Sequence, residues 1–507
     1  MPINSVFAWF IKKRLHQIEL FKQYPHDVQN EIRDGLVDYA SLTTFGKEHH
    51  FKKIKTYSDF STAIPVRKYE DLHGYIEQTL QGESNVLWPG LTQNFAKSSG
   101  TTNNRSKYIP ITEENLENCH YKGGKDLLAL YYSLRPMADL YSGKTLIVGG
   151  SQKLNSNEHN VVGDLSGIII SNLPIWVEMK RVPSKEISLM ENWEEKIFAM
   201  AKGTLNEDVR VLSGVPSWTQ QLLNKILELS NKENINQVWP NLQLYMHGGV
   251  SFLPYEAAFD SLLPNKTTDF VETYNASEGF FGIQDQLNTK ELLLMLDYGV
   301  FYEFIPEEEW HKDFPCVLPL EEVQVNTPYA LVITTNSGLW RYNLGDTIAF
   351  TSVAPYRFKI IGRTKAFINL VGEELMVHNV EQAISVCSKK MHVGIIEFTV
   401  APIPPDAIYH ARHEWFIEFS EQSVDLNRFA NLLDEELRQL NSDYDAKRQG
   451  NLNLLQPIVN QIQPNGFNAV LKNRNKLGGQ HKIPRLTNSR EWASELKQYI
   501  YQSPSFL

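Results

Sequence analysis

Residues 242–249 are Leu-Gln-Leu-Tyr-Met-His-Gly-Gly, a short apolar run that stops at two glycines. Residues 145–150, Thr-Leu-Ile-Val-Gly-Gly, show the same pattern, and the runs at 210–212 and 270–274 also end in small residues. Short apolar runs that end in small-residue loops, with helical stretches between several of them, indicate a parallel sheet in an α/β domain. Ligands of such sheets bind beyond the carboxyl ends of the strands, so we expect a functional site at these loops.

The stretches on either side of this core follow other patterns. The first hundred residues are mostly helical in pattern, because apolar residues recur on one face and helix breakers are sparse. Residues 292–350 are rich in strand formers and turn glycines, which predicts a meander with strands at 292–296, 300–305, 330–335 and 339–342. Residues 357–361 form another strand. The elements predicted beyond it are a helix starting near Val380, strands at 393–400 and 414–419, and a long helix at 426–448.

These changes of pattern indicate a domain boundary near 360–365. At ~150 residues per domain, the 507 residues suffice for two or three domains. We predict an α/β fold with a large N-terminal α/β domain containing mixed sheets, residues 1–362, and a smaller C-terminal α+β domain, residues 363–507.

Composition restricts the class of protein. Residues are 42% hydrophobic and 21% charged, which excludes a disordered or low-complexity chain. The net charge is −10, which argues against a protein that binds nucleic acid mainly through its phosphates. Three widely spaced cysteines exclude a disulfide scaffold and suit a reducing compartment. No apolar run approaches the ~18–20 residues of a membrane span. Together with the charge and the cysteines, this predicts a cytoplasmic protein with neither a nucleic-acid nor a membrane partner.

Residues 95–107, Phe-Ala-Lys-Ser-Ser-Gly-Thr-Thr-Asn-Asn-Arg-Ser-Lys, combine hydroxyls, a glycine and flanking cations. Backbone N–H groups and hydroxyls of such a loop can surround phosphate oxygens, and Lys107 can neutralise their charge. The Gly-Lys-Ser/Thr ending of a Walker A loop is absent. The pattern therefore predicts an anion site of another kind. The alternative is an exposed loop of small polar residues.

Three further motifs follow strands. Residues 274–279, Tyr-Asn-Ala-Ser-Glu-Gly, offer a tyrosine that can stack on a base and a carboxylate that can hold Mg²⁺. Residues 339–346, Leu-Trp-Arg-Tyr-Asn-Leu-Gly-Asp, end in an aspartate suited to bonding ribose hydroxyls. Residues 362–375 begin Gly-Arg-Thr-Lys and look like a hinge segment with two cations. The alternatives are turns without a ligand for the first two motifs and an exposed hairpin for the third.

The order and spacing of these motifs are typical of adenylate-forming enzymes, which activate a carboxylate with ATP. In detail, the chain resembles the Gretchen Hagen auxin-responsive family of acyl-acid amido synthetases and its bacterial relatives over nearly its whole length. The resemblance also rests on residues 69–72 and 87–90 and on residues 478–485, Gly-Gly-Gln-His-Lys-Ile-Pro-Arg. It implies a large N-terminal domain and a small, mobile C-terminal domain that rotates between two half-reactions.

The resemblance also implies the chemistry. A carboxylate attacks the α-phosphorus of ATP to give an acyl-adenylate and pyrophosphate, and an amine, usually an amino acid, then displaces AMP to form an amide. The expected cofactors and partners are ATP, Mg²⁺, a small carboxylic acid and an amino acid or other amine. The resemblance implies a role for each motif residue. The phosphates of ATP are surrounded by Ser98, Ser99, Gly100, Thr101, Thr102 and Lys107, Tyr274 flanks the adenine, and Asp346 and Arg363 bind the ribose. Ser277 lies beside the α-phosphate, Glu278 ligates Mg²⁺, and Lys482 bridges the carboxylate and the α-phosphate. His247, Gly248 and Val250 line the acyl site, with Gly249 on its nucleotide side.

The sequence departs from the family pattern at two places. Asn103-Asn104 stands where the family commonly has a small residue and a glycine, which leaves the shape of the first loop open. Residues 366–369, Ala-Phe-Ile-Asn, include no acidic residue where many members of the superfamily have an aspartate, so Lys365 is either the pivot or a phosphate contact. Lys476 competes with Lys482 for the catalytic role.

The sequence predicts fewer residues of the acyl site than of the nucleotide site. His247 either faces the acyl group or is a structural histidine. The aromatic residues near the motifs either favour an apolar or aromatic acid or simply pack in the core; they are Phe252, Phe280 and Phe281.

Two other functions are compatible with these motifs. The acyl group could pass to coenzyme A or a carrier thiol in place of an amine, or the chain could bind a nucleotide without catalysis. A serine hydrolase is disfavoured because the Gly-x-Ser-x-Gly nucleophile motif is absent from the sequence.

Overall fold

The computed structural model divides the chain into two compact units. Unit 1 comprises Met1–Val215, Gln237–Gly249 and Thr267–Ile360, and unit 2 comprises Pro216–Asn236, Val250–Lys266 and Ile361–Leu507. The described residues are 2–98, 107–150, 155–156, 160–310, 312–364, 367–368, 370–371, 373, 375–404, 411–448, 454–474, 476–477, 482–487 and 489–501. The chain passes from unit 1 to unit 2 for the last time between residues 360 and 361, beside the predicted boundary at 362, but two earlier stretches also belong to unit 2. A division into two domains at 362 therefore stays a prediction.

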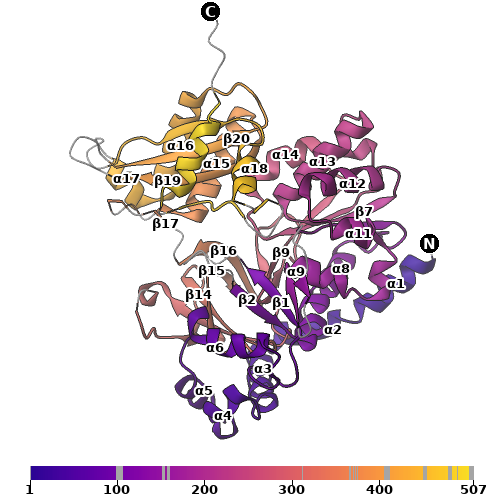
Figure 1. Cartoon of the computed structure of the whole chain (residues 1–507), viewed down its shortest axis with the longest axis vertical. Coiled ribbons are helices and arrows are strands. Elements are labelled where there is room, and N and C mark those ends of the chain that lie inside the picture. The colour runs from indigo at the N-terminus through magenta and orange to yellow at the C-terminus, as the bar shows by residue number, and fades with distance from the viewer. Residues whose placement is uncertain are drawn as a thin grey trace, which may run out of the picture. The chain divides into compact units, whose positions relative to one another are not determined.

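Unit 1 is built on a sheet of twelve strands among the described residues (Figure 1). The strand order is β13-β12-β14-β15-β16-β11-β10-β9-β8-β7-β3-β6. The neighbours from β6 to β9 run parallel, and β9 to β11 and β12 to β15 pair antiparallel. The strands are β3 (Lys144–Val148), β6 (Arg181–Val182), β7 (Val209–Gly214), β8 (Leu244–Gly248), β9 (Asp269–Ala276), β10 (Gly279–Ile283), β11 (Leu292–Leu294), β12 (Val300–Pro306), β13 (Leu318–Pro319), β14 (Pro328–Thr335), β15 (Tyr342–Val353) and β16 (Tyr356–Arg363). The predicted α/β fold with mixed sheets is confirmed.

The carboxyl ends of the parallel strands form one edge of the sheet, which we call the carboxyl edge. Gly248 at the end of β8 must be a glycine, because a Cβ there would lie 2.3 Å from the carbonyl oxygen of Thr273 in β9. Gly249 has a φ of +81°, a left-handed conformation that other residues rarely adopt. The two glycines therefore let β8 approach β9 closely and then turn away.

A bend in the sheet lies at β10. The pairing of β9 with β10 shifts between Phe280 and Gly282, which is the signature of a β-bulge. A Cβ on Gly282 would lie 2.8 Å from the ring of Phe358 in β16. The bulge and the glycine together allow the strands beside β10 to fold towards one another.

A smaller sheet in unit 1 carries the ends of the first motif. Its order is β2-β1-β5-β4, and its strands are β1 (Asn94–Ser98), β2 (Lys107–Ile111), β4 (Asn155–Ser156) and β5 (Val161–Gly163). β1 and β2 are antiparallel, and Ser98 pairs with Lys107. The predicted phosphate loop thus joins two paired strands, while its residues 99–106 lie outside the described residues.

Helices and the sheet enclose a large hydrophobic core in unit 1. The first hundred residues are helical up to β1, as predicted. The helices are α1 (Pro2–Lys12), α2 (Leu15–Gln23), α3 (Pro25–Tyr39), α4 (Thr44–Glu48), α5 (Tyr57–Ala63), α6 (Tyr69–Leu80), α7 (Glu113–Asn115), the π-helical η2 (Leu116–Tyr121), α8 (Lys122–Leu134), α9 (Leu165–Ser171), α10 (Ile175–Glu178), α11 (Lys185–Ser188) and α12 (Trp193–Thr204). No helix in the described part of the chain is long and apolar enough to cross a bilayer.

Unit 2 is an α+β structure with its own cores. Its sheets have the orders β19-β20-β21 and β17-β18. The strands are β17 (Phe367–Ile368), β18 (Leu375–Met376), β19 (Ile395–Ile403), β20 (Arg412–Phe419) and β21 (Ile458–Ile462). The helices are α13 (Pro216–Ser230), α14 (Glu256–Leu262), α15 (Val377–Met391), α16 (Leu426–Leu440), α17 (Ser442–Arg448), α18 (Gly466–Asn473) and α19 (Glu491–Leu496).

Three element predictions are wrong. The long helix at 426–448 is two helices, because the side chain of Asn441 accepts a hydrogen bond from the Tyr444 backbone N–H at 2.8 Å and so caps a new helix. The predicted strand at 339–342 does not form, because Arg341 has a φ of +43°, and β15 starts only at Tyr342. The predicted meander is interrupted, since β11 pairs with β10 and β16 and not with β12.

A buried ion pair explains the unusual backbone at Arg341. Its Nη2 lies 2.8 Å from Oε1 of Glu303 in β12, and its Nη1 donates to the carbonyl oxygens of Ser61 and Ile64 at 3.0 and 2.7 Å. The guanidinium thus joins the residue just before β15 to β12 and to the end of α5. A buried charge is tolerated only when it is paired and hydrogen-bonded in this way.

Candidate functional site

The turn between β9 and β10 holds two predicted site residues in unit 1. Ala276 pairs with Gly279, so Ser277 and Glu278 form a two-residue turn, and both are buried. A Cβ on Gly279 would lie 2.7 Å from the ring of Phe281, so only glycine closes this hairpin. A hydroxyl and a carboxylate are therefore held rigidly at the carboxyl edge.

A hydrogen bond joins the second motif to the third. The hydroxyl of Tyr274 donates to Oδ2 of Asp346 at 2.5 Å, and both side chains are buried. The Tyr274 ring also packs edge-on against Phe281 and Phe358, with ring centroids 5.0 and 6.2 Å apart. Asp346 follows Gly345, whose φ of +80° turns the strand. The residues expected at the adenine and at the ribose are thus in direct contact.

Lys107 brings the end of the first motif to the same strand as Asp346. Its Nζ donates to the hydroxyl of Tyr342 at 3.1 Å and lies 5.5 Å from the centre of the Tyr69 ring. Ser98 pairs with Lys107 across the β1–β2 ladder. The other predicted residues of this loop, Ser99, Gly100, Thr101 and Thr102, lie outside the described residues.

Two buried histidines contact the ends of β8 and β9. His247 lies in β8 just before its last residue, Gly248, and the hydroxyl of Thr273 in β9 donates to the His247 carbonyl oxygen at 3.1 Å. His120, in η2, has its Nδ1 3.1 Å from the side-chain oxygen of Asn275. Burial lowers the pKa of His247 to about 3 and the pKa of His120 to about 4. Both imidazoles are therefore neutral at neutral pH, and neither supplies positive charge to an anionic substrate.

The remaining predicted residues belong to unit 2. Val250, Arg363 and Lys482 are in this unit, and the side chains of Arg363 and Lys482 are exposed. Lys365 lies outside the described residues. The Lys482 segment is anchored to β19, because the hydroxyl of Thr399 donates to the Pro484 carbonyl oxygen at 2.6 Å and the Val400 N–H donates to the Arg485 carbonyl oxygen at 3.0 Å.

Arg485 fixes this segment further within unit 2. Its guanidinium is buried, pairs with Glu397, and donates to the hydroxyl of Tyr255 at 2.8 Å. Glu381 lies 3.9 Å away. The exposed side chain of Lys482 therefore belongs to a segment whose next residues are held by backbone and side-chain contacts.

The aromatic residues near the motifs mostly belong to the core. Phe280 and Phe281 are 5% and 0% exposed and are part of the large hydrophobic cluster of unit 1. Their contacts are with Tyr298, Tyr274 and Tyr302. Of the two interpretations of these rings, core packing is the one that the structure supports.

Lys196 is a functional candidate that the sequence reasoning missed. Its ammonium is fully buried and donates to the carbonyl oxygens of Gly149, Gly150 and Ser188 at 2.9, 2.7 and 2.6 Å. Gly149 and Gly150 follow β3 at the carboxyl edge, so Lys196 positions one of the loops expected to line the site. The available signal was a lysine on the apolar face of α12, beside Trp193 and Met200.

No cluster of three or more metal-ligating side chains occurs among the residues that the structure describes. Glu278 is a single carboxylate held in a tight turn. This donor set suits a cation such as Mg²⁺, which commonly binds one or two protein carboxylates and takes its other ligands from water and phosphate oxygens.

Two solved structures of ligases have the same fold as this chain. A structure of 2-hydroxyisobutyryl-CoA ligase in the postadenylation state, in complex with 2-HIB-AMP, matches with a TM-score of 0.57 at 13% identity, over 93% of this chain and 90% of that chain. A structure of AtGH3.15 acyl acid amido synthetase in complex with 2,4-DB matches with a TM-score of 0.80 at 16% identity, over 97% and 96% of the two chains.

The chain belongs to the GH3 family. Family models for its N-terminal, central and C-terminal domains match residues 14–268, 293–363 and 378–491. Among curated relatives, the indole-3-acetic acid-amido synthetase GH3.4 of Arabidopsis thaliana is 23% identical over 93% of this chain and 91% of its own length. The family expected from the motifs is confirmed.

The buried ammonium of Lys196 generates a prediction about pH. Burial lowers the pKa of Lys196 to about 8, whereas the pKa of a lysine in an unfolded chain is about 10.4. Between these values the unfolded chain binds a proton that the folded chain has released, so stability rises with pH. We expect the wild type to gain stability relative to Lys196→Met as the pH rises from 8 towards 10, measured by the denaturant midpoint.

The control for this experiment lies on the same helix. Lys202 is exposed on α12, so Lys202→Met should follow the pH profile of the wild type. A Lys196→Met profile that runs parallel to the wild type across this range would contradict the assignment of a buried, depressed ammonium.

Proposed function

We propose that this protein is an ATP-dependent acyl-acid amido synthetase, which adenylates a carboxylic acid and transfers the acyl group to an amine, most simply an amino acid. The observation that carries this proposal is the contact between Tyr274 and Asp346. Ser277 and Glu278 lie in the turn that follows the strand of Tyr274, and Lys107 contacts Tyr342 in the strand of Asp346. Membership in the GH3 family supports the amide product. With ATP as its substrate, we expect the protein to act in the cytoplasm.

The nucleotide is proposed to bind at the carboxyl edge of unit 1. The Tyr274 ring flanks the adenine, and its hydroxyl holds the Asp346 carboxylate in the orientation that accepts bonds from the ribose hydroxyls. The loop between Ser98 and Lys107 surrounds the phosphates, and the Lys107 ammonium neutralises part of their charge. Glu278 would hold Mg²⁺, which supplies further neutralisation of the phosphates. The hydroxyl of Ser277, the residue before Glu278, is proposed to donate a hydrogen bond to the α-phosphate.

Lys482 is proposed to stabilise the adenylation step. In this step the carboxylate attacks the α-phosphorus, so negative charge approaches negative charge, and a fixed cation lowers the barrier. The anchoring of its segment by Thr399 and Arg485 supports this role, because a preorganised donor needs little rearrangement. A rotation of the C-terminal domain between half-reactions, with Arg363 and Lys365 near its pivot, remains part of the proposal.

The acyl group is proposed to lie beside the ends of β8 and β9, against His247, Gly248, Gly249 and Val250. The glycines permit close approach of a ligand to the backbone. Because His247 is neutral, it can orient an acid by a hydrogen bond but cannot form an ion pair with it. The carboxylate of the acid is therefore proposed to interact with the cations that act in adenylation, Lys482 and Mg²⁺.

The function is tested by measuring acid-dependent pyrophosphate release with ATP and Mg²⁺ across a panel of carboxylic acids. Each active acid is then offered amino acids or coenzyme A, and the products are identified by mass spectrometry. We expect amides. Thioester without amide would shift the assignment to a coenzyme A ligase, and silence across the panel from protein that binds ATP would indicate a non-catalytic nucleotide-binding protein.

Lys482→Ala should lower the rate of adenylation by about 10²–10³-fold, the usual effect of removing one preorganised donor. Amide formation from a supplied acyl-adenylate should be largely retained, because the lysine acts in the first half-reaction. Lys476→Ala is the control and should leave both rates near those of the wild type. Unchanged pyrophosphate release in Lys482→Ala would refute the assigned role.

Tyr274→Phe removes only the hydroxyl that holds Asp346. We expect the KM for ATP to rise about fivefold, the equivalent of roughly 1 kcal/mol for one hydrogen bond, with the KM for the acid unchanged. Tyr131→Phe is a matched control, because Tyr131 also donates to a carboxylate in unit 1, Asp269 Oδ2 at 2.9 Å, at the start of β9. Equal effects of the two variants on the KM for ATP would count against the site.

A further inference from the structure

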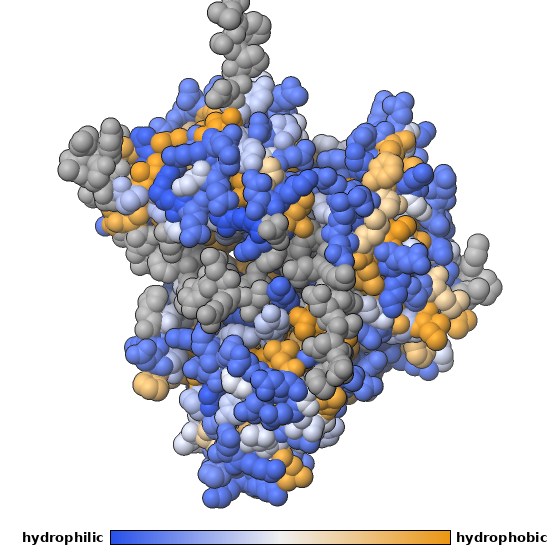
Figure 2. All heavy atoms as spheres, viewed as in Figure 1, coloured by the Kyte–Doolittle hydropathy of each residue, from blue (hydrophilic) through white to orange (hydrophobic). Residues whose placement is uncertain are grey.

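An apolar surface lies on unit 1 at the edge opposite the site, where the parallel strands begin. Its side chains come from α1 and from α10 and the residue after it, and we call them the amino-edge surface. They are Val6, Trp9, Phe10, Ile175, Trp176 and Met179, with exposed fractions of 65%, 64%, 50%, 80%, 36% and 67%. Figure 2 shows hydrophobic atoms gathered at its right-hand edge, where Figure 1 labels α1.

The two helices of this surface are joined through aromatic contacts. Phe7 of α1 stacks on Tyr141 with ring centroids 4.0 Å apart and packs against Trp176 of α10 at 5.6 Å. The hydroxyl of Tyr141 donates to the Trp176 carbonyl oxygen at 3.3 Å. Packing between α1 and α10 therefore places their exposed apolar side chains on one continuous surface.

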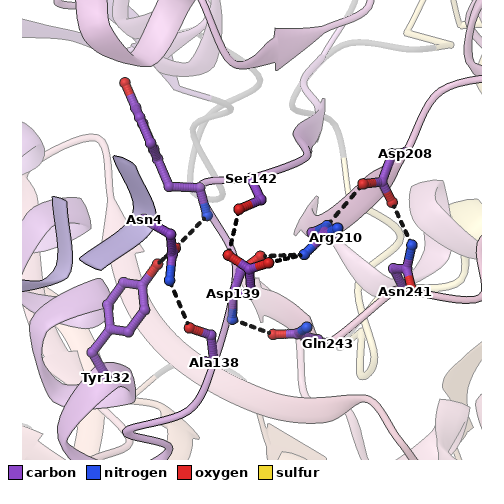
Figure 3. Close-up of polar contacts among 10 residues, drawn as sticks. Asn4, Tyr132, Ala138, Asp139, Ser142, Asp208, Arg210, Asn241 and Gln243 are labelled. Carbon is purple, nitrogen blue, oxygen red and sulfur yellow. Dashed lines mark hydrogen bonds and ion pairs between the residues drawn. The ribbon is translucent and has the colours of Figure 1, made fainter. Parts of the chain in front are cut away.

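Polar contacts of Asn4 hold α1 in place (Figure 3). The Asn4 side chain donates to the Ala138 carbonyl oxygen at 3.0 Å, and it accepts from the Tyr132 hydroxyl at 2.7 Å and the Tyr141 N–H at 3.1 Å. All three partners precede β3. The orientation of α1 is thus specified by buried hydrogen bonds, and the exposure of Trp9 and Phe10 follows from it.

The segment that receives α1 is itself fixed to the sheet. Asp139 accepts from Arg210 at 2.7 Å and its N–H donates to the Gln243 side chain at 3.0 Å. Arg210 also donates to Asp208 at 2.9 Å, and Asn241 donates to the same carboxylate at 3.0 Å. Arg210 therefore bridges the two acidic groups beneath the surface and offsets one of their two negative charges (Figure 3).

Lysines surround the amino-edge surface, although the whole chain carries a net charge of −10. Lys13 lies 3.9 Å from the centre of the Trp9 ring, Lys125 lies 5.0 Å from that of Phe10, and Lys180 lies 4.9 Å from that of Tyr141. Lys144 donates to the Met179 carbonyl oxygen at 3.4 Å. Glu178, the acidic residue of α10, is paired with Arg181 at 2.6 Å. The local charge is thus positive.

We propose that the amino-edge surface binds the interface of an anionic lipid bilayer. Tryptophan and phenylalanine side chains favour the boundary between headgroups and acyl chains, and lysines beside them attract anionic headgroups. A protein partner is the less suitable occupant, because lysine is depleted in protein–protein interfaces. The expectation of no membrane partner rested on the length of a spanning helix, whereas a helix that lies in the interface needs only one apolar face.

The test is sedimentation of the full-length protein with vesicles of phosphatidylcholine alone or mixed with phosphatidylglycerol. We expect binding to the anionic vesicles, and weakening by salt. Lys13→Glu/Lys125→Glu should lower the partition coefficient by at least about 30-fold, from ~1 kcal/mol per lysine. Trp9→Ser/Phe10→Ser should lower it by at least about tenfold. Acid-dependent pyrophosphate release should be unchanged in both variants, which verifies folding and separates this proposal from the proposed function.

Two control variants change the same residue types elsewhere in unit 1. Phe314→Ser removes another exposed aromatic side chain, and Lys52→Glu/Lys53→Glu reverses two exposed lysines. Both should bind vesicles like the wild type. The proposal is overturned if anionic vesicles fail to bind, or if the controls weaken binding as much as the surface variants do. A concentration-dependent dimer that Trp9→Ser/Phe10→Ser abolishes, without vesicle binding, would overturn it in favour of a second copy of this chain.

Discussion

The hydrogen bond between Tyr274 and Asp346 is the constraint on which the arrangement of unit 1 depends. Their strands, β9 and β15, are separated in the sheet order by β10, β11 and β16. At a spacing of about 4.8 Å per strand, a flat sheet would keep them roughly 19 Å apart. A contact of 2.5 Å therefore requires the sheet to curl strongly between them. The bulge after Phe280 and the missing Cβ of Gly282 are what permit that curl.

Local sequence patterns predicted much of the fold, because small residues that end strands leave a signal at short range. The strands that end at Gly149 and at Gly248 could be identified from their composition alone. The curl of the sheet could not be predicted, since it depends on Gly282 meeting a ring seventy-six positions later in the sequence, Phe358. The helix break at Asn441 was missed because apolar periodicity continues across it, while a single side-chain cap decides the geometry.

The residues of the candidate site likewise fall into those that local sequence predicts and those that it does not. The motif residues Tyr274 and Asp346 could be found because their types and spacing are local, and the structure brings them together. Lys196 and Arg341 act through buried contacts with distant backbone carbonyls or carboxylates, and such partners leave no mark near either residue in the sequence. Burial also decides the charge of His247, which a sequence cannot reveal. Residue types were therefore more predictable than their protonation states.

The parallel direction of β3, β7, β8 and β9 has a consequence for orientation. All four strands begin at the side of α1 and end at the side of Tyr274, so the two surfaces of unit 1 face opposite ways. A molecule held by its amino edge would present its reacting side to the bulk liquid. Its turnover would then follow the dissolved concentration of each substrate, and an acid partitioned into the lipid phase would have to leave that phase before it could react.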